Sequence, residues 1–194
     1  MKFFSRKNKI DGEQGFTLVE TLVAVGIFSV SIAAVISVTA QGVSSTTAAK
    51  NRLIGNYLAQ ETIEYVRHLR NKYTPVVGVS ANWNQFVDMI GSCSGKYCVT
   101  ADPTESNPTT EVIPCGDQID QTACSDFPVV YDTDTGYFLQ PSSTSPNTPF
   151  RRYFTIEIVS ANEIKIISTV AWNEKNNNPK NVTLTETLTN WLPN

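Results

Sequence analysis

The feature that most constrains this chain is an apolar run over residues 16–40, FTLVETLVAVGIFSVSIAAVISVTA, in which Glu20 is the single ionisable side chain. A helix needs roughly 20 apolar residues to cross a hydrocarbon core of about 30 Å. The apolar core of a cleaved secretory signal is shorter, about 7–15 residues. The run therefore predicts a membrane-spanning helix that stays with the protein.

The charge on the two sides of this run is uneven. Residues 1–15 carry a net +2 and the rest of the chain −5, within a total of −3. Positive charge before a span predicts that this end stays cytoplasmic and that the remainder is exported. Between residues 73 and 150, nine acidic residues face a single base, Lys96, which argues against direct nucleic-acid binding.

The helix is expected to continue beyond the apolar run, because no proline occurs from Phe16 to Tyr73. Over residues 41–73 apolar side chains recur at steps of three and four, the period of one helical face. Pro75 and Gly78 are expected to end the helix. The predicted apolar stripe consists of Leu53, Ile54, Tyr57, Leu58, Thr62, Tyr65, Val66, Leu69 and Tyr73. The predicted solvated face includes Glu61 and Glu64, with Glu64 in reach of Arg67 or His68.

The C-terminal part, residues 150–194, predicts an antiparallel meander. Three stretches, residues 153–160, 164–172 and 182–191, are rich in β-branched and aromatic residues with alternating polarity. Phe154, Ile156 and Ile158 are expected to face the apolar stripe of the helix, which would cover them. The preceding Arg151 and Arg152 are interpreted as a solvated edge.

Residues 74–149 predict a loop-rich region, with a short helix over 82–90 and a small hairpin over 127–140. All four cysteines, Cys93, Cys98, Cys115 and Cys124, fall in this region. An even number in an exported segment indicates disulfides. Their C-x4-C and C-x8-C spacings differ from the C-x2-C of zinc sites. Of three connectivities, nearest-neighbour pairing is favoured, and no metal site is expected.

The residues Gly15-Phe16-Thr17-Leu18-Val19-Glu20 resemble the processing site of type IV prepilins. The resemblance implies that residues 1–15 are a leader, that a prepilin peptidase cuts between Gly15 and Phe16, and that Phe16 becomes N-methylated. It also implies the α+β type IV pilin fold, a long N-terminal helix whose C-terminal half packs on an antiparallel sheet. Leu58–Arg70 and the C-terminal VTLTETLTNW look more loosely like PilV-like minor pilins.

Glu20 is a carboxylate within an apolar run, and elementary electrostatics indicates that it needs a positive partner. A carboxylate in a bilayer costs several kcal/mol unless it is compensated, so it is normally there for a purpose. Cleavage after Gly15 would create a positive amine on Phe16, four residues before Glu20 on the same helical face. The helix dipole also favours a negative charge in the first turn. Glu20 is therefore expected to pair with such an amine, its own or a neighbour's, during assembly.

Three weaker signals have simpler interpretations. Asp132 and Asp134, in DTDTG, resemble the start of a calcium loop, but the fifth position is Gly136 and the distal glutamate is missing. Tight turns select the same residues. His68 is expected to be a solvated helical residue. Trp83, Trp172 and Trp191 are expected in the core or at sheet edges.

Taken together, these features predict a minor pilin of a type IV pilus rather than an enzyme, with no cofactor. The expected partners are other pilin subunits, the prepilin peptidase, an inner-membrane assembly platform and, before assembly, the membrane. The protein would be single-pass in a bacterial inner membrane and later part of an extracellular pilus. A pseudopilin of a type II secretion system, in a periplasmic pseudopilus, is the alternative. A membrane-tethered module that binds a surface through residues 74–149 is a further one.

Overall fold

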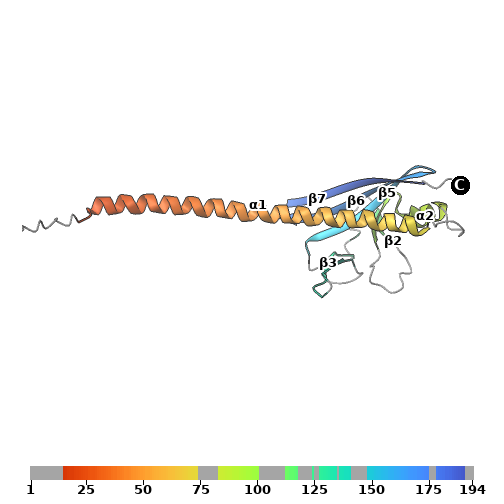
Figure 1. Cartoon of the computed structure of the whole chain (residues 1–194), viewed down its shortest axis with the longest axis horizontal. Coiled ribbons are helices and arrows are strands. Elements are labelled where there is room, and N and C mark those ends of the chain that lie inside the picture. The colour runs from red at the N-terminus through yellow and green to blue at the C-terminus, as the bar shows by residue number, and fades with distance from the viewer. Residues whose placement is uncertain are drawn as a thin grey trace, which may run out of the picture. The chain divides into compact units, whose positions relative to one another are not determined.

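The computed structural model describes residues 15–73, 83–100, 112–117, 124, 127–134, 136–140, 148–174 and 178–190 (Figure 1). Most of the expected leader, the helix-ending Pro75 and Gly78, and Trp191 lie outside these residues. The chain divides into two compact units, Met1–Thr47 and Ala48–Asn194, which are described separately below.

A single helix, α1 (Leu18–Tyr73), follows a short non-helical start at Gly15, Phe16 and Thr17. Thr17 caps it: the Glu20 backbone N–H donates to the Thr17 hydroxyl over 3.3 Å. Such a cap gives a hydrogen-bond partner to one of the backbone N–H groups in the first turn, which have no carbonyl partner within the helix. The last turn of α1 carries Arg70 and Lys72, whose positive charges interact favourably with the negative end of the helix dipole. The predicted continuity of the helix is confirmed from Leu18 to Tyr73, whereas Pro75 and Gly78, which were expected to end it, lie outside the described residues.

The first unit contains the apolar part of α1, whose side chains are exposed throughout residues 15–47. Among the described residues, α1 is the one helix long and apolar enough to cross a membrane, with a mean hydropathy of 2.4 over its most apolar window. Five hydroxyls in this part donate to the carbonyl four residues earlier, those of Ser29, Ser31, Thr39, Thr46 and Thr47. These hydrogen bonds lower the free-energy cost of placing serine and threonine hydroxyls in an apolar surrounding.

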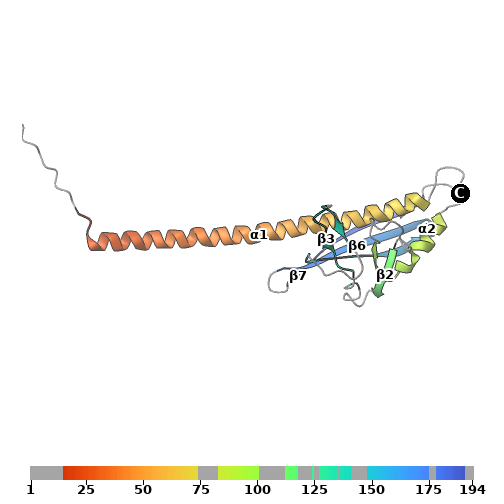
Figure 2. The ribbon, with the colours of Figure 1, turned by 90° about the horizontal axis from the view of Figure 1, so that it is seen from below.

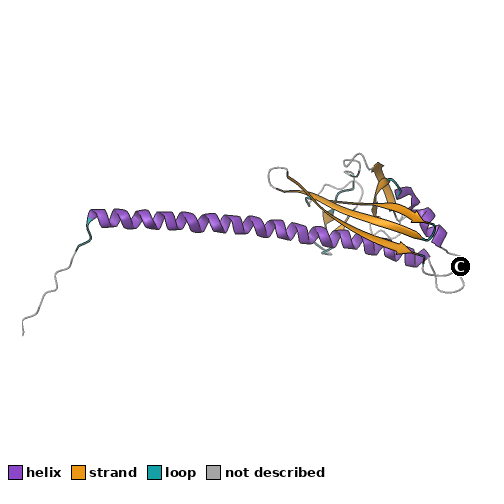
Figure 3. Cartoon of the chain, turned by 90° about the horizontal axis from the view of Figure 1, so that it is seen from above, coloured by secondary structure: helices purple, strands orange, loops and turns teal. Residues whose placement is uncertain are grey.

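The second unit is built on a five-stranded antiparallel sheet in the order β2-β1-β5-β6-β7. Its three long strands form the predicted meander: β5 (Phe150–Ser160), β6 (Glu163–Glu174) and β7 (Asn178–Thr189). They run beside the yellow, C-terminal part of α1 in Figure 1 and form the broad orange layer of Figure 3. The turn between β6 and β7 is shorter than the expected one over 173–180, because their ladder continues to the pair Glu174–Asn178.

Two further strands extend the sheet, β1 (Lys96–Thr100) and β2 (Val112–Asp117). Neither strand is predicted from the sequence, because the cysteines, a proline and a glycine within them obscure the alternation of polar and apolar residues. The register of β1 and β2 shifts between Tyr97 and Cys98, which is a bulge. The predicted short helix is α2 (Trp83–Ile90), followed by the 3₁₀ turn η1 (Gly91–Cys93); Figure 2 shows α2 at one end of the sheet. A separate hairpin, β3 (Val130–Tyr131) with β4 (Phe138–Leu139), matches the expected one.

The main core lies between α1 and one face of the sheet. The buried positions of α1 are Gly55, Leu58, Ala59, Thr62, Ile63, Val66 and Leu69. Facing them are Phe154 and Ile156 of β5 and Ile164, Ile166, Val170 and Trp172 of β6. Gly55 allows a close approach, since a Cβ there would lie 2.9 Å from the Trp172 ring. Phe154 and Ile156 face the helix as predicted.

Three residues of the predicted stripe and sheet face differ from expectation. Leu53 and Tyr57 are 55% and 62% exposed, because they lie on the side of α1 opposite to the buried positions. Ile158 is also largely exposed. It lies near the end of β5, beyond the residue that pairs with β1.

The opposite face of β5 is covered too. Tyr153 is buried in a small cluster with Val99 of β1 and Cys124, packed against Tyr97, Ile113 and Phe127. Thr155 is also buried, and its hydroxyl donates to the Cys93 carbonyl over 3.1 Å. A β-strand buried on both faces belongs to the middle of a layered head. Cys124 and Phe127, which follow β2 in the chain, contribute to the cover on this second face.

The interpretation of Arg152 as a solvated edge is wrong. Its side chain is only 4% exposed and faces α1, where its guanidinium contacts a Glu61 carboxylate oxygen at 2.8 Å and donates to Gln140 Oε1 over 3.1 Å. Gln140 in turn donates to the Arg152 carbonyl over 2.7 Å. The alternation of β5 decides the direction, because position 152 shares a face with Phe154 and Ile156. Arg151 is exposed, as expected.

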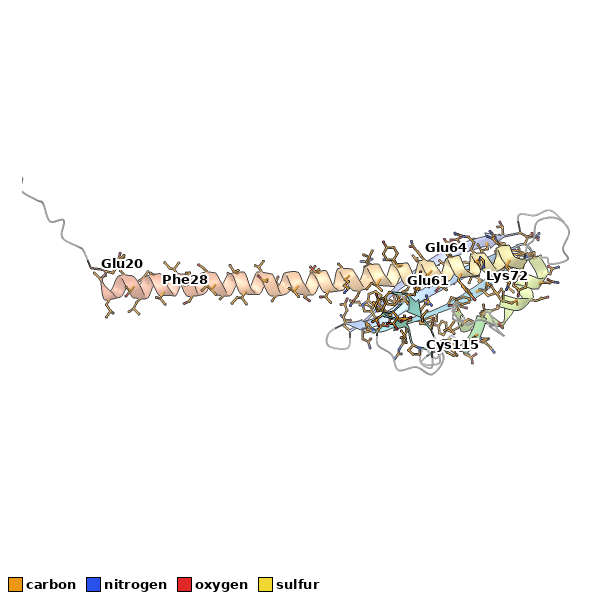
Figure 4. All side chains as sticks on the ribbon, turned by 60° about the horizontal axis from the view of Figure 1, so that its bottom comes forward. Glu20, Phe28, Glu61, Glu64, Lys72 and Cys115 are labelled. Atoms are coloured by element: carbon orange, nitrogen blue, oxygen red, sulfur yellow. A yellow bond between two sulfur atoms is a disulfide. The ribbon has the colours of Figure 1, made fainter. Side chains whose placement is uncertain are left out.

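A second ionic contact ties α1 to β7, the strand at one edge of the sheet. Arg67 pairs with Glu64 on α1, as predicted, and with Glu186 on β7. The hydrogen bond to Glu186 is the main cause that raises the pKa of Arg67, ahead of the opposing effect of desolvation. Figure 4 labels Glu61 and Glu64 on the part of α1 that lies beside the sheet.

Candidate processing and assembly site

The predicted cleavage site lies in the short segment before α1. Gly15 and Phe16 are both exposed and non-helical, and the Phe16 side chain is 81% exposed. A Cβ added to Gly15 would meet no atom within 4 Å. The fold therefore places no steric demand for glycine at this position, so a requirement for it would come from an external protein that reads this segment.

Glu20 lies in the first turn of α1, three residues after the capping Thr17 (Figure 4). This T-x-x-E spacing is also that of a capping box, in which the glutamate reaches back to the cap backbone. Here the threonine half of the box is formed, while the Glu20 carboxylate makes no hydrogen bond or ion pair with another described residue. Thr17 is a site residue that sequence reasoning missed, although the T-x-x-E signal was present. The exposed Glu20 carboxylate is left available to a positive partner.

The cysteines form two disulfides, Cys93–Cys98 and Cys115–Cys124, which is the nearest-neighbour pairing that the sequence favoured. The first joins η1 to β1 inside the main core, where both sulfurs are fully buried. The second joins β2 to the residue that packs on Tyr153. Sulfurs bonded to one another are not available as thiolate ligands of zinc.

The calcium candidate forms a tight turn. The Asp134 backbone N–H donates to the Asp132 carboxylate, and the Gly136 N–H to the Asp132 carbonyl, both over 2.9 Å. This is the Asx-type turn that aspartate and glycine favour. His68 is exposed on α1. No group of three side chains that could hold a metal ion occurs in the part of the chain that the structure describes.

The comparison with protein families adds a direct finding at the N-terminus. Residues 11–36 match the prokaryotic N-terminal methylation motif, a range that contains Gly15, Phe16 and Glu20. No curated protein and no solved structure shows a significant similarity to the chain. The motif implies processing by a prepilin peptidase and assembly with other pilins. The methylation motif and the apolar N-terminal helix support a type IV pilin-like prepilin, and the helix packed on an antiparallel sheet is an α+β, type IV pilin-like fold.

Proposed function

We propose that this protein is a minor pilin that is cut between Gly15 and Phe16, methylated on Phe16 and incorporated into, or at the tip of, a type IV pilus. The observation that carries the proposal is the match of residues 11–36 to the methylation motif, at the start of a helix whose apolar half is fully exposed. An exposed apolar segment of this size must be covered by lipid or by protein. In a membrane precursor that later joins a fibre, lipid would cover this segment first and neighbouring subunits would cover it afterwards.

Glu20 would supply the electrostatic link in this assembly. Cleavage leaves a positive amine at Phe16, close to the Glu20 carboxylate, which the described residues leave without a partner. The same amine on a neighbouring subunit would neutralise the carboxylate in an apolar surrounding, where an uncompensated charge costs several kcal/mol. The pair would therefore favour one stagger of adjacent helices.

Processing is tested by co-expression with a prepilin peptidase and intact-mass spectrometry of the product. The expected product lacks residues 1–15 and carries one added methyl group. Gly15→Val should block the cut while leaving the fold unchanged, because nothing in the structure opposes a side chain there. Gly42→Ala is the matched control, since that glycine also has open space around it. An intact wild-type N-terminus, or a cut beyond residue 30, would overturn the proposal.

Assembly is tested by shearing surface fibres from a host that makes type IV pili. We expect the wild-type chain to co-purify with the fibres, and Glu20→Ala to be inserted and cleaved but largely absent from them. Glu64→Ala is the matched control, because its carboxylate lies on the exposed side of the head. Recovery of the protein only with a periplasmic secretion complex would favour the pseudopilin alternative, which shares the motif and the fold.

A further inference from the structure

One end of the sheet carries cations from three different elements. The Trp172 ring, near the end of β6, lies against Gly55 of α1, and Trp172 pairs in the ladder with Lys180 of β7. Arg151 of β5 pairs with Ala171, the residue before Trp172. Two cations of α1 lie within five residues of Gly55, or about 8 Å along the helix axis. The four cations at this end, called here the basic end, are Lys50, Arg52, Arg151 and Lys180.

The positive charge of the basic end is not compensated within the head. All four side chains belong to exposed residues, and none of them makes an ion pair with another described residue. The helix α1 has no acidic residue between Glu20 and Glu61, and Glu61 pairs with the buried Arg152. Glu174, the last residue of β6, is the acidic residue that the three long strands place at this end. The basic end is therefore open to an external anion.

The chain places the basic end close to the apolar part of α1. Val43 is the last large apolar residue of this part, and Lys50 and Arg52 follow it by seven and nine residues, or about 11 and 14 Å along a helix. The headgroup region of a bilayer extends about 5–8 Å beyond the hydrocarbon core on each side. Lysine and arginine side chains are long enough to extend toward such a layer. A membrane that covers α1 up to Val43 therefore brings lipid phosphates within reach of these cations.

Arg151 also lines a small cavity at this end. The cavity has a volume of about 170 Å³ and is lined by Pro149, Arg151, Ala171, Trp172, Asn173 and Pro179. Arg151 is the charged residue of this lining, and the Asn173 amide offers a further donor. A guanidinium can bind a phosphate through two parallel hydrogen bonds. The cavity thus suits an anionic oxygen group.

We propose that the basic end binds the phosphate headgroups of anionic phospholipids while the precursor is anchored in the membrane. The inference rests on the proposed function and names a lipid class as a further partner of the precursor. Each cation near an anionic membrane surface strengthens binding about fivefold, and the effect falls off within a Debye length. This length is about 10 Å at 0.1 M salt and about 3 Å at 1 M. The binding should therefore be selective for anionic lipid and weakened by salt.

The test uses the full-length chain reconstituted in vesicles that contain equal amounts of phosphatidylglycerol, which is anionic, and phosphatidylcholine, which has no net charge. A photo-crosslinking amino acid replaces the exposed Asn173, and mass spectrometry identifies the captured lipid. At low salt, adducts of phosphatidylglycerol should exceed those of phosphatidylcholine at least tenfold. In about 1 M salt the ratio should fall below threefold, because the charges are screened.

The variant Arg151→Gln/Lys180→Gln should lower the low-salt ratio below threefold. The matched control is Lys96→Gln/Lys165→Gln, which removes the same charge from the start of β1 and the early part of β6. The control should keep the ratio within twofold of the wild-type value. Both variants should form the two disulfides and melt within a few degrees of the wild type, since all four residues lie at the surface or near it.

The outcomes separate the inference from the function on which it rests. Extraction of the wild-type chain from the vesicles by alkaline carbonate would overturn the membrane precursor and this inference with it. Stable insertion with equal capture of the two lipids would overturn the inference alone, and so would an equal loss of selectivity in both double variants. Capture of a second copy of the chain in place of lipid would also overturn it.

Discussion

The side chain of Arg152 shows how a single position can link the helix and the sheet. Its guanidinium is buried between β5 and α1, while its carboxylate partner, Glu61, is half-exposed. The buried cation is compensated by Glu61 and by Gln140 Oε1. Removing one partner of such a group leaves a charge that the interior solvates poorly.

Glu61→Gln should therefore lower the free energy of unfolding of the head by about 1–3 kcal/mol, the cost of weakening a bond to a buried charge. Glu64→Gln is the matched control, since Glu64 and Arg67 form a more exposed pair worth at most about 1 kcal/mol. Urea unfolding of both variants in detergent measures the difference. Equal effects of the two substitutions would contradict the buried role of Arg152.

Gly55 provides a second test at this scale. An alanine Cβ would lie 2.9 Å from the Trp172 ring, which is itself buried. Overpacking of this kind costs about 1–3 kcal/mol, more than the roughly 1 kcal/mol that alanine gains over glycine in a helix. Gly55→Ala should therefore lower the melting temperature, whereas Gly42→Ala, with open space around it, should not. A more stable Gly55→Ala would show that the ring moves freely.

Tyr153 is expected to make the head sensitive to alkaline pH. Burial is the main cause that raises its pKa above the ordinary value of about 10, with a smaller contribution from Tyr97. A raised pKa contributes stability that is fully present below the unfolded value and is lost as the pH rises through the folded one. Unfolding free energies measured from pH 8 to 11 should fall less steeply above about pH 10 in Tyr153→Phe than in the wild type. Parallel curves would refute the assignment.

Among the elements, β5 has the most demanding position, because both of its faces are buried over residues 152–156. One face packs on α1 and on the Cys93–Cys98 bridge, and the other packs on the cluster that contains Cys115 and Cys124. The two disulfides differ in their surroundings: Cys93 and Cys98 are fully buried, while Cys115 is partly exposed. Loop closure therefore predicts that Cys115–Cys124 stabilises the head more, whereas core packing predicts that Cys93–Cys98 does.

Loop entropy alone assigns about 2 kcal/mol to Cys93–Cys98 and about 3 kcal/mol to Cys115–Cys124. Replacing Cys93 and Cys98 by alanine also removes buried volume from the main core, which adds a cavity cost. We expect Cys93→Ala/Cys98→Ala to be the more destabilising double variant in thermal unfolding. A larger loss of stability on removing Cys115–Cys124 would indicate that the bridges stabilise the head only by restricting the unfolded chain.

At the scale of the whole molecule, the described buried residues all lie between Gly55 and Leu188, in the second compact unit. The first unit contributes exposed apolar surface and the methylation motif. The buried core of the head and the methylation motif thus lie in different parts of one chain. Residues 48–194 should therefore fold into the head without the first unit.

Expression of residues 48–194 in an oxidising compartment should give a water-soluble protein with both disulfides and a melting temperature within a few degrees of that of the full-length protein. It should be absent from sheared fibres, because it lacks the apolar segment. Circular dichroism and peptide mapping measure the first two properties. Aggregated or disulfide-scrambled material would show that residues before 48 are needed for folding.

The apolar segment, the processing motif, the continuity of α1, the three long strands and the favoured disulfide pairing could all be predicted from the sequence. These depend on local patterns: an apolar run, a helical period, alternation along strands, and cysteines close in the chain. The three-dimensional fold was needed to show that β1 and β2 join the sheet, that Arg152 turns inward to Glu61, and that Leu53 and Tyr57 face away from the head. Each of these depends on which face of an element meets a partner far along the chain, and a local pattern carries no information about that partner.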